Sequence, residues 1–322
     1  MKVCVLGSGA FGISLGSITN KNGNMTVLWT HSESSADQLR KKRVSEKLPN
    51  YKIDKSIMIT SDLESAVKDS DLIVIAVPAF AFEEVTIDLK KYINRSQSVL
   101  IATKGIQQGT CLFLNDVFNK YLKNDLAVIS GPTFAKDIVN GSPVGFSLAT
   151  RSKKTAEIVK NCFENDTTKF RVTNDIKGIE ICGSIKNVMA IAAGMLEGMK
   201  VSDSTRALFL TESMNDIKEL IKALGGKKKS ILSFAGFGDI LMTCTSQNSR
   251  NFSFGYLIGS GSSREEINDY LKNTTVEGMY TLKSINKLVK KKKVHIPIIH
   301  LINDIINGKK EKEEMLKFLI EK

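Results

Sequence analysis

The first half of the chain alternates short, continuous apolar runs with segments whose apolar residues recur at helical spacing. Continuous apolar runs are typical of strands buried in a parallel sheet. They lie at residues 3–6, 25–29, 56–60, 71–77, 98–103, 126–130, 144–150 and 169–173. Helices are predicted between them at residues 13–20, 79–93, 111–122 and 153–163. A further helix is expected to begin at a capping box formed by Ser61 and Glu64.

This alternation predicts a doubly wound α/β domain with a parallel sheet. After about residue 180 the strand pattern disappears and only helical spacing continues. Residues 178–199 predict one long helix, and residues 207–224 predict a second that ends at Gly225 in a left-handed conformation. The chain is therefore expected to form a sheet domain at residues 1–180 and an all-helical domain at residues 181–322.

Three glycines follow the first apolar run in the spacing G-x-G-x-x-G. Between a strand and a helix, Gly7 makes the tight turn, Gly9 lets the backbone approach a pyrophosphate, and Gly12 lets the helix pack on the strand. The free N–H groups at the helix start would then face the phosphates. A simple turn can show the same spacing, but the position after the first strand favours dinucleotide binding.

The chain of 322 residues carries a formal net charge of +12. Most of the surplus is lysine in runs at residues 41–43, 227–229 and 290–293. Because these runs lack interleaved aromatic residues, they favour a solvated surface over a nucleic-acid interface. We therefore expect no nucleic-acid partner, although a positive field helps to attract an anionic small substrate.

Cysteine usage and apolar run lengths indicate a cytoplasmic protein. The five scattered cysteines form no C-x-x-C pair, so reduced, buried thiols are expected. The first strand is expected from residue 2, which leaves no cleavable leader, and the apolar run at residues 72–82 is too short to span a bilayer. We expect no stable membrane insertion. The three histidines have no ligand spacing, so no metal is expected.

Three polar loops follow predicted strands at the sheet edge where open parallel sheets bind their ligands, at residues 77–80, 103–105 and 130–136. Lys104 comes directly after the apolar run at residues 98–103, so its ammonium is expected in the cleft. The loop after residues 126–130 offers backbone N–H groups and the Thr133 hydroxyl. An ordinary loop lysine is the alternative for Lys104, and a plain turn explains the loop after residues 126–130 nearly as well.

Lys186 lies inside the predicted long helix, among small or apolar residues on most faces. A lysine seldom occupies such a position unless its amine has a task, and the task we favour is that of a proton acceptor. Asp239 follows Gly238 at a predicted helix start, where its carboxylate either caps the helix or orients a lysine.

A hydroxyl, a guanidinium and an amide lie side by side in Ser249, Arg250 and Asn251. Guanidinium donors match phosphate oxygens in a bidentate geometry. Chance produces such a triplet often in surface loops, but its position after residues 239–245 favours a phosphate clamp.

Six motifs occur in the order found in bacterial NAD(P)-dependent glycerol-3-phosphate dehydrogenases, and they extend over essentially the whole chain. They are GSGAFG, ATKG, SGPTFAK, SIKNV, AGFGDILMTCTSQNSRN and VEG. The chain resembles this family. The resemblance implies an N-terminal Rossmann domain, a helical substrate-binding domain, and interconversion of sn-glycerol 3-phosphate and dihydroxyacetone phosphate with NAD(H) or NADP(H). It also implies a supply of glycerol 3-phosphate for phospholipid synthesis.

The resemblance also implies roles for individual residues. Lys186 corresponds to the proton acceptor and Lys104 to a residue that bridges substrate and cofactor, while Asp239 would hold the catalytic lysine. Substrate contacts are implied at Lys104, Gly131, Thr133, Lys186, Asp239, Ser249, Arg250 and Asn251. Cofactor contacts are implied at Gly7, Gly9, Ala10, Phe11, Gly12, His31, Lys104, Gly131, Ala135, Arg250, Thr275 and Glu277.

The sequence departs from the family pattern at three places. Glu212 and Ser213 stand where an Arg-Gly pair usually follows the threonine, and Thr275 stands where an apolar residue is common. Ala10 has no hydroxyl, so a phosphate contact there must come from the backbone. None of these departures removes a residue with an implied catalytic role.

The cofactor preference depends on the end of the second predicted strand. Thr30 and His31 lie there, with Glu33 beyond them, and none of the three strongly repels a 2′-phosphate. The basic residues at 40–42 lie too far along the next helix to bind that phosphate. Use of both cofactors, or a preference for NADPH, is therefore expected.

Other functions stay open from the residues alone. They are a reductase of the same two-domain plan acting on a hydroxy acid, imine or ketopantoate, a non-catalytic nucleotide-sensing module, and a nucleic-acid-binding protein. The triplet at residues 249–251 favours a phosphorylated substrate, and the presence of Lys186 and Asp239 disfavours a sensing module. The sequence does not fix the oligomeric state, and a homodimer is one assembly that it allows.

Overall fold

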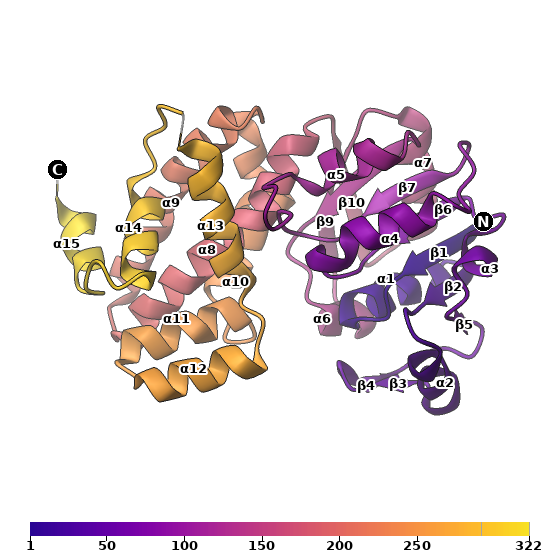
Figure 1. Ribbon diagram of the computed structural model, residues 1–322, viewed down its shortest axis with the longest axis horizontal. Helices are drawn as coiled ribbons and strands as arrows, with labels where there is room; N and C mark the ends of the chain where they lie inside the picture. Colours follow the sequence, from indigo (N-terminus) through magenta and orange to yellow (C-terminus); the bar gives the residue numbers. More distant parts are fainter. Residues whose placement is uncertain (291, 322) are drawn as a thin grey trace. The chain divides into compact units, whose positions relative to one another are not determined.

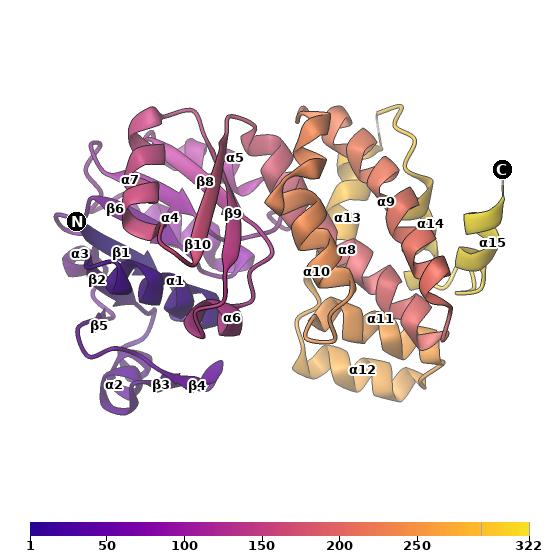
Figure 2. The ribbon, with the colours of Figure 1, turned by 180° about the vertical axis from the view of Figure 1, so that it is seen from behind.

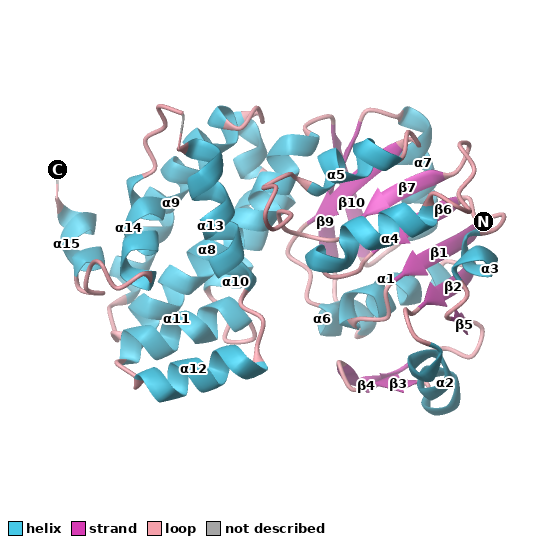
Figure 3. Cartoon of the chain, in the orientation of Figure 1, coloured by secondary structure: helices cyan, strands magenta, loops and turns pink. Residues whose placement is uncertain are grey.

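The computed structural model describes residues 1–290 and 292–321, and the chain divides into two compact units. The first unit comprises Met1–Gln107 and Leu112–Ile176, and the second comprises Gln108–Cys111 and the chain from Lys177 onward. Every strand among the described residues lies in the first unit, and the second unit is helical (Figure 3). The expected succession of a sheet-based half and a helical half is confirmed.

The first unit is built on an eight-stranded sheet in the order β10-β9-β8-β7-β6-β1-β2-β5. The strands are β1 Lys2–Leu6, β2 Met25–Trp29, β5 Met58–Thr60, β6 Leu72–Ile75, β7 Ser98–Ile101, β8 Leu126–Ser130, β9 Val144–Thr150 and β10 Thr168–Thr173. Strand β1 is central, because Val5 is paired with Leu28 on one side and with Val74 on the other. The strand order reverses beside β1, at the point where doubly wound sheets bind nucleotides.

The sequence analysis expected a parallel sheet, but one pair of neighbouring strands in it is antiparallel. Strands β8 and β9 pair antiparallel, with Ile129 opposite Leu148, whereas β9 and β10 run parallel to each other. The connection between β8 and β9 contains only the short helix α6 (Ala135–Val139) and returns at the same end of the sheet. A buried apolar run has the same pattern in both directions, so residues 144–150 could not reveal the direction of their strand.

Helices cover both faces of the sheet. Helices α4 (Phe82–Leu89) and α5 (Leu114–Tyr121) lie together on one face (Figure 1). Helices α1 (Ala10–Lys21) and α7 (Lys153–Phe163) lie on the opposite face, which Figure 2 shows from behind. Every residue of β6 and β7 is buried between these layers, which explains the continuous apolar runs.

The start of helix α3 (Leu63–Val67) differs from the prediction. Asp62, not Ser61, caps this helix, because its carboxylate accepts the N–H groups of Glu64 at 3.0 Å and Ser65 at 3.4 Å. Aspartate caps helices as well as serine does, so two adjacent candidates competed for the position. The Ser61 hydroxyl instead donates to the Glu33 carboxylate.

A small antiparallel pair, β3 (Val44–Ser45) and β4 (Leu48–Lys52), lies outside the main sheet and was not predicted. It follows helix α2 (Glu33–Lys42). The sequence LPNYK contains a proline and lacks regular alternation, so it carries no strand pattern. Pairing within the hairpin, rather than side-chain periodicity, determines its conformation.

The second unit is built around α8 (Ile176–Gly198), which confirms the single long helix. The other α-helices are α9 Asp203–Ala223, α10 Asp239–Cys244, α11 Arg250–Ser260, α12 Arg264–Asn273, α13 Glu277–Val289, α14 Pro297–Ile306 and α15 Glu314–Ile320. Gly225 follows α9 with φ of +89°, as expected. Helix α8 is long and apolar enough to cross a membrane by length and composition, but 94% of its most apolar window is buried inside the fold.

Glycines let α8 and α11 pack backbone against backbone. A Cβ atom on Gly255 would overlap the carbonyl oxygen of Ile191, and one on Gly194 would overlap the carbonyl oxygen of Phe252. Gly259 faces the carbonyl of Met195 in the same way. This close contact fixes the position of α11 against α8 within the second unit.

The five cysteines are free and buried, as predicted. Burial raises the pKa of the Cys4 thiol to about 12, and it raises that of Cys244 equally. A thiol with so high a pKa carries almost no thiolate at neutral pH, so both behave as small apolar core residues.

Candidate active site

The three loop glycines differ in the space around them, and Gly7 and Gly12 have the turn and packing roles that their spacing predicted. Gly7 has φ of +121°, and a Cβ atom on it would lie 2.7 Å from the Ala76 carbonyl oxygen. A Cβ atom on Gly12 would overlap the Gly7 carbonyl, so the helix and the loop pack closely there. Around Gly9 a Cβ atom would meet nothing within 4 Å. The space beside Gly9 is therefore open, as the approach of a ligand requires.

Gly9 is also the N-cap of α1 and, being a glycine, has no side chain to cap the helix. The Ile13 N–H donates to the Gly9 carbonyl, so the N–H groups of the first turn, including those of Ala10 and Phe11, precede the first intrahelical donor. These N–H groups and the helix dipole favour an anion at this end of α1.

The glycine loop is tied to the end of β2. The Gly7 N–H donates to the Trp29 carbonyl, and the Ser8 hydroxyl donates to the Thr30 hydroxyl at 2.8 Å. His31 follows in an exposed position, with its ring 6.2 Å from the Trp29 ring in an edge arrangement. Two hydrogen bonds thus join the glycine loop to the end of β2.

Lys104 lies among residues from two other loops of the same unit. Its Nζ atom donates to the Gly131 carbonyl at 3.3 Å and lies 5.9 Å from the centre of the Phe11 ring. The Thr133 hydroxyl donates to the same Gly131 carbonyl at 3.2 Å. The structure therefore brings together Lys104, Gly131 and Thr133, as their positions after two neighbouring strands predicted, and it places the Phe11 ring beside Lys104. Ala135 begins α6 just beyond them.

The Lys186 ammonium forms an ion pair in the second unit. Its Nζ atom donates to the Asp239 carboxylate at 2.7 Å and to the Thr243 hydroxyl at 3.3 Å. The Asp239 side chain is fully buried, whereas 11% of the Lys186 side chain is exposed. The pair thus has a buried carboxylate as its anchor and a partly accessible ammonium.

Asp239 begins α10, directly after a π-helical turn at Phe234–Gly238. Single π-helical turns occur frequently at functional sites. The side chain of Asp239 is turned to Lys186, so of the two roles predicted for it the structure favours lysine orientation. Thr243 was missed, although its position four residues after Asp239 places it on the same face of the helix.

The predicted clamp lies at the N-terminus of α11. Ser249 is its N-cap and accepts the Phe252 N–H at 3.3 Å, while the Asn251 side chain accepts the Gly278 N–H at 2.8 Å. Arg250 is 58% exposed, and its Nη2 atom lies 3.8 Å from the Glu277 carboxylate. The hydrogen bonds of Ser249 and Asn251 therefore fix the start of α11, from which the Arg250 guanidinium extends.

Glu277 connects the clamp to α8. The Asn187 side chain donates to its carboxylate at 3.1 Å, so Asn187, Arg250 and Glu277 form one polar group. The Asn187–Glu277 contact was not predicted, because it joins residues 90 positions apart. Thr275, just before α13, is exposed.

Both halves of the chain match models of one protein family. Residues 2–156 match the family model of the NAD-dependent glycerol-3-phosphate dehydrogenase N-terminus, and residues 175–317 match that of the C-terminus.

The chain belongs to the NAD-dependent glycerol-3-phosphate dehydrogenase family.

Relatives of this family match nearly the whole chain. A glycerol-3-phosphate dehydrogenase [NAD(P)+] of Fusobacterium nucleatum is 33% identical over 99% of this chain and 96% of its own length. One of Thermoanaerobacter is 35% identical over 95% of this chain and 92% of its own length. The crystal structure of glycerol-3-phosphate dehydrogenase from Coxiella burnetii superposes with a TM-score of 0.91 at 28% identity, covering 100% of this chain and 99% of that one.

A ketopantoate reductase from Ralstonia eutropha has a TM-score of 0.61 at 13% identity over 98% of this chain and all of its own. That likeness shows the shared fold alone. The two-domain plan is thus common to several reductases, and the identity of the substrate must come from the site residues.

Proposed function

We propose that this protein interconverts sn-glycerol 3-phosphate and dihydroxyacetone phosphate with NAD(H) or NADP(H). The observation that carries the proposal is the Lys186–Asp239 ion pair, with a 2.7 Å contact, a fully buried carboxylate and a partly accessible amine. A dehydrogenase must move a proton at the substrate oxygen as well as a hydride at carbon. Lys186 is a general acid–base group of the required kind.

The first unit suits a dinucleotide cofactor. The open space beside Gly9, the N–H groups at the start of α1 and the close packing at Gly12 fit the pyrophosphate of such a cofactor. When bound, the nicotinamide supplies or accepts the hydride at the central carbon of the substrate. Cofactor contacts are assigned to Gly7, Gly9, Ala10, Phe11, Gly12, His31, Lys104, Ala135, Arg250, Thr275 and Glu277.

Lys186 transfers the proton in both directions. In reduction its ammonium donates a proton to the alkoxide that forms on the substrate, and in oxidation its amine accepts one. Asp239 and Thr243 hold the Nζ atom, so the lysine does not need to be ordered when the substrate arrives. Lys104 is assigned a positive charge near the developing oxyanion.

Arg250 is assigned to the substrate phosphate. Its exposed guanidinium extends from the N-terminus of α11, where the helix dipole adds to its attraction for an anion. The remaining substrate contacts are assigned to Gly131, Thr133, Ser249 and Asn251. These residues match the family motifs and offer backbone or side-chain hydrogen-bonding groups.

The domain roles follow the same assignment. Residues 1–180 are proposed to bind the cofactor, and residues 181–322 are proposed to bind the substrate. We place the enzyme in the cytoplasm, as a supplier of glycerol 3-phosphate for phospholipid synthesis that acts without a nucleic-acid partner or stable membrane insertion.

One assay tests the function. The purified protein should oxidise NADH or NADPH when dihydroxyacetone phosphate is added, and not when ketopantoate is added. Arg250→Ala should raise the KM for dihydroxyacetone phosphate far more than that for unphosphorylated dihydroxyacetone. Arg264→Ala, which removes an exposed arginine from the first position of α12, is the matched control and should change neither. Turnover of ketopantoate alone would contradict the proposal.

A further inference from the structure

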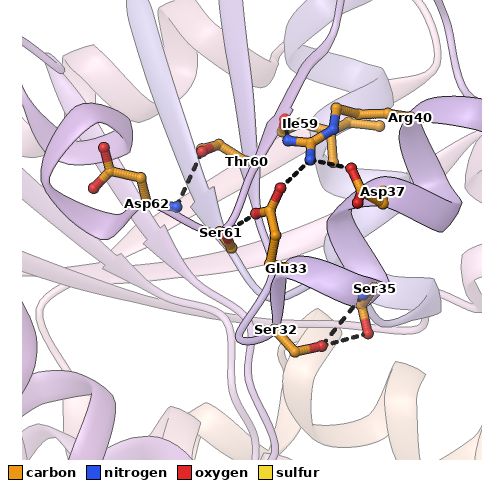
Figure 4. Close-up of polar contacts among 9 residues, drawn as sticks. All are labelled: Ser32, Glu33, Ser35, Asp37, Arg40, Ile59, Thr60, Ser61 and Asp62. Carbon is orange, nitrogen blue, oxygen red and sulfur yellow. Dashed lines mark hydrogen bonds and ion pairs between the residues drawn. The ribbon is translucent and has the colours of Figure 1, made fainter.

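A polar cluster at the end of β2 bears on the choice between NAD(H) and NADP(H), and its interpretation rests on the proposed function. The cluster consists of Glu33, Asp37, Arg40 and Ser61 (Figure 4). Glu33 is the first residue of α2, four positions beyond the end of β2. In nucleotide-binding sheets an acidic residue about 20 positions after the glycine loop binds the ribose 2′-hydroxyl.

The start of α2 is held in place from two sides. Ser32 caps the helix by accepting the Ser35 N–H at 3.3 Å. The end of β2 is joined to the glycine loop by the Gly7 and Ser8 hydrogen bonds and to the end of β5 by the Thr30 N–H, which donates to the Thr60 carbonyl. Glu33 is therefore positioned relative to the loop that we assign to the pyrophosphate.

The Glu33 carboxylate is held by two donors. The Ser61 hydroxyl donates to one of its oxygens, and the Arg40 guanidinium donates to the other (Figure 4). Each carboxylate oxygen has two lone-pair sites, so the carboxylate can still accept a ribose hydroxyl. The two donors fix its orientation but leave 61% of the side chain exposed.

Arg40 is occupied by acidic partners. Its guanidinium pairs with both Glu33 and Asp37 and also lies 3.4 Å from the Ile59 carbonyl. It is the one arginine between Thr30 and Lys42. The next arginine, Arg43, donates to the carbonyls of Ile57 at 2.7 Å and Asp54 at 3.1 Å. Both guanidinium groups therefore support the local backbone and carboxylates, and neither matches the free arginine that a 2′-phosphate requires.

The charges of the cluster sum to one negative charge, from two carboxylates and one guanidinium. The hydrogen bond from Ser61, and then that from Arg40, lowers the pKa of the Glu33 carboxyl, and Arg40 lowers the pKa of Asp37. Both groups are thus ionised at neutral pH. A 2′-phosphate would bring like charge to an exposed carboxylate, which is unfavourable.

We infer that Glu33, fixed by Ser61 and Arg40, is a specificity-determining residue that accepts the ribose 2′-hydroxyl and makes this enzyme prefer NAD(H) over NADP(H). This differs from the expectation of dual use or an NADPH preference. That expectation took Glu33 to lie beyond the end of the strand and did not include the contacts with Ser61 and Arg40. Glu33 and Ser61 are 28 residues apart in the sequence, so their contact could not be predicted from local patterns.

Direct binding tests the inference without relying on turnover. Titrations of the full-length protein should give a Kd for NADH at least about tenfold lower than the Kd for NADPH. The repulsion between two like charges near a protein surface is large enough to cause a difference of about this size. Glu33→Gln should reduce this ratio at least about fivefold, mainly through tighter NADPH binding. Glu33→Asp should retain most of the preference, since it keeps the charge.

Two further variants separate the role of Glu33 from general charge effects. Glu64→Gln, at an exposed carboxylate in the first turn of α3, should leave the ratio unchanged. Asp37→Asn loosens Arg40 but keeps Glu33, so it should change the ratio less than Glu33→Gln does. Equal affinities in the parent, or an unchanged ratio in Glu33→Gln, would overturn the inference while leaving the proposed function intact. Binding of neither cofactor would overturn the proposed function and the inference together.

Discussion

The residues assigned to the cofactor in the first unit and those assigned to the substrate in the second offer different kinds of chemical group. In the first unit the backbone does most of the work, because a glycine loop and a helix N-terminus present N–H groups beside open space at Gly9. In the second unit side chains do it, because Lys186 and Asp239 come from different helices and meet in a buried ion pair. The difference predicts that substitutions in the two units fail in different ways.

A substitution in a loop site leaves the fold intact but weakens ligand binding. A site made of buried side chains depends on how its helices pack, so its weak points include residues far from the chemistry. Gly194 and Gly255 are such residues, because they allow the contact between α8, which carries Lys186, and α11, which carries Arg250. The following predictions test this contrast, from the largest expected effect to the smallest.

Gly255→Val should cause the largest loss. Its side chain would overlap the backbone of Ile191 and force α11 away from α8. Overpacking of this kind costs about 3 kcal/mol or more, which corresponds to a fall of roughly 5–10 °C in the thermal midpoint. Thermal unfolding followed by circular dichroism measures it. Ser260→Ala, an exposed site on the same helix, is the control, and equal midpoints for the two variants would contradict the packing argument.

Gly9→Val should remove cofactor binding and leave the fold unchanged. A side chain there meets no protein atom, but it fills the space that we assign to the pyrophosphate. We expect the Kd for NADH to rise about a hundredfold, equivalent to ~2.7 kcal/mol, with an unchanged thermal midpoint of the free protein. Gly16→Ala, at a helical glycine with ordinary space around it, should bind like the parent. Normal binding by Gly9→Val would show that the loop is only a turn.

Asp216→Asn should change how stability depends on pH. Asp216 is buried on α9 and accepts the Ile299 N–H at the start of α14 at 3.0 Å. Burial raises the pKa of its carboxyl to about 6, above the ordinary value of 3.8. Between about pH 4 and 6 the folded state keeps a proton that the unfolded state has lost, so this group contributes less stability as the pH rises through that window.

The asparagine has no such titration and can still accept the Ile299 N–H. The thermal midpoint of Asp216→Asn, measured relative to the parent, should therefore rise between pH 4 and pH 7. A constant difference over this range would show that Asp216 titrates normally.

Ser213→Ala should have the smallest effect, and it should stabilise the protein. The Ser213 hydroxyl is fully buried in α9 and has no hydrogen-bond partner among residues 1–290 and 292–321. A buried hydroxyl without a partner costs about 1–3 kcal/mol, part of which alanine recovers. Thermal unfolding should show a small rise in midpoint, and the exposed Ser204→Ala should show none. A lower midpoint for Ser213→Ala would mean that the hydroxyl has a stabilising role.

The sequence predicted the elements whose signals are local. Apolar runs identified the strands of the main sheet, and glycine spacing identified the loop before α1. Lys186 was found because a cation inside an apolar helix is unusual, and Asp239 was found at a helix start. These signals lie within a few residues of the position that they describe.

The missed features depend on contacts between distant residues. The antiparallel direction of β9, the Asn187–Glu277 contact and the cluster around Glu33 each involve partners that the chain brings together only after folding. Ser61 was predicted as a cap because Glu64 follows it at capping-box spacing, but Asp62 occupies the N-cap position.

The central claim is that Lys186 transfers the proton, whereas Asp239 only positions the Lys186 ammonium. The variant Lys186→Met tests this claim most directly. Methionine has a similar length and no charge. General acid–base groups contribute about 10²–10⁴ in rate, so turnover in both directions should fall at least about a hundredfold while the Kd for NADH is unchanged. Lys222→Met, at an exposed position of α9, is the control for removal of a lysine and should keep parental turnover.

Because Lys186→Met leaves the Asp239 carboxylate buried without its ammonium, that variant is unstable if the pair is needed for folding. The double variant Lys186→Met/Asp239→Asn removes both charges and serves as the second protein for the same measurement. The decisive measurement is the single-turnover rate of NADH oxidation by dihydroxyacetone phosphate in a variant that circular dichroism shows to be folded. A rate reduced at least about a hundredfold agrees with the account. A near-parental rate would contradict it and transfer the proton-transfer role to another residue, with Lys104 the next candidate.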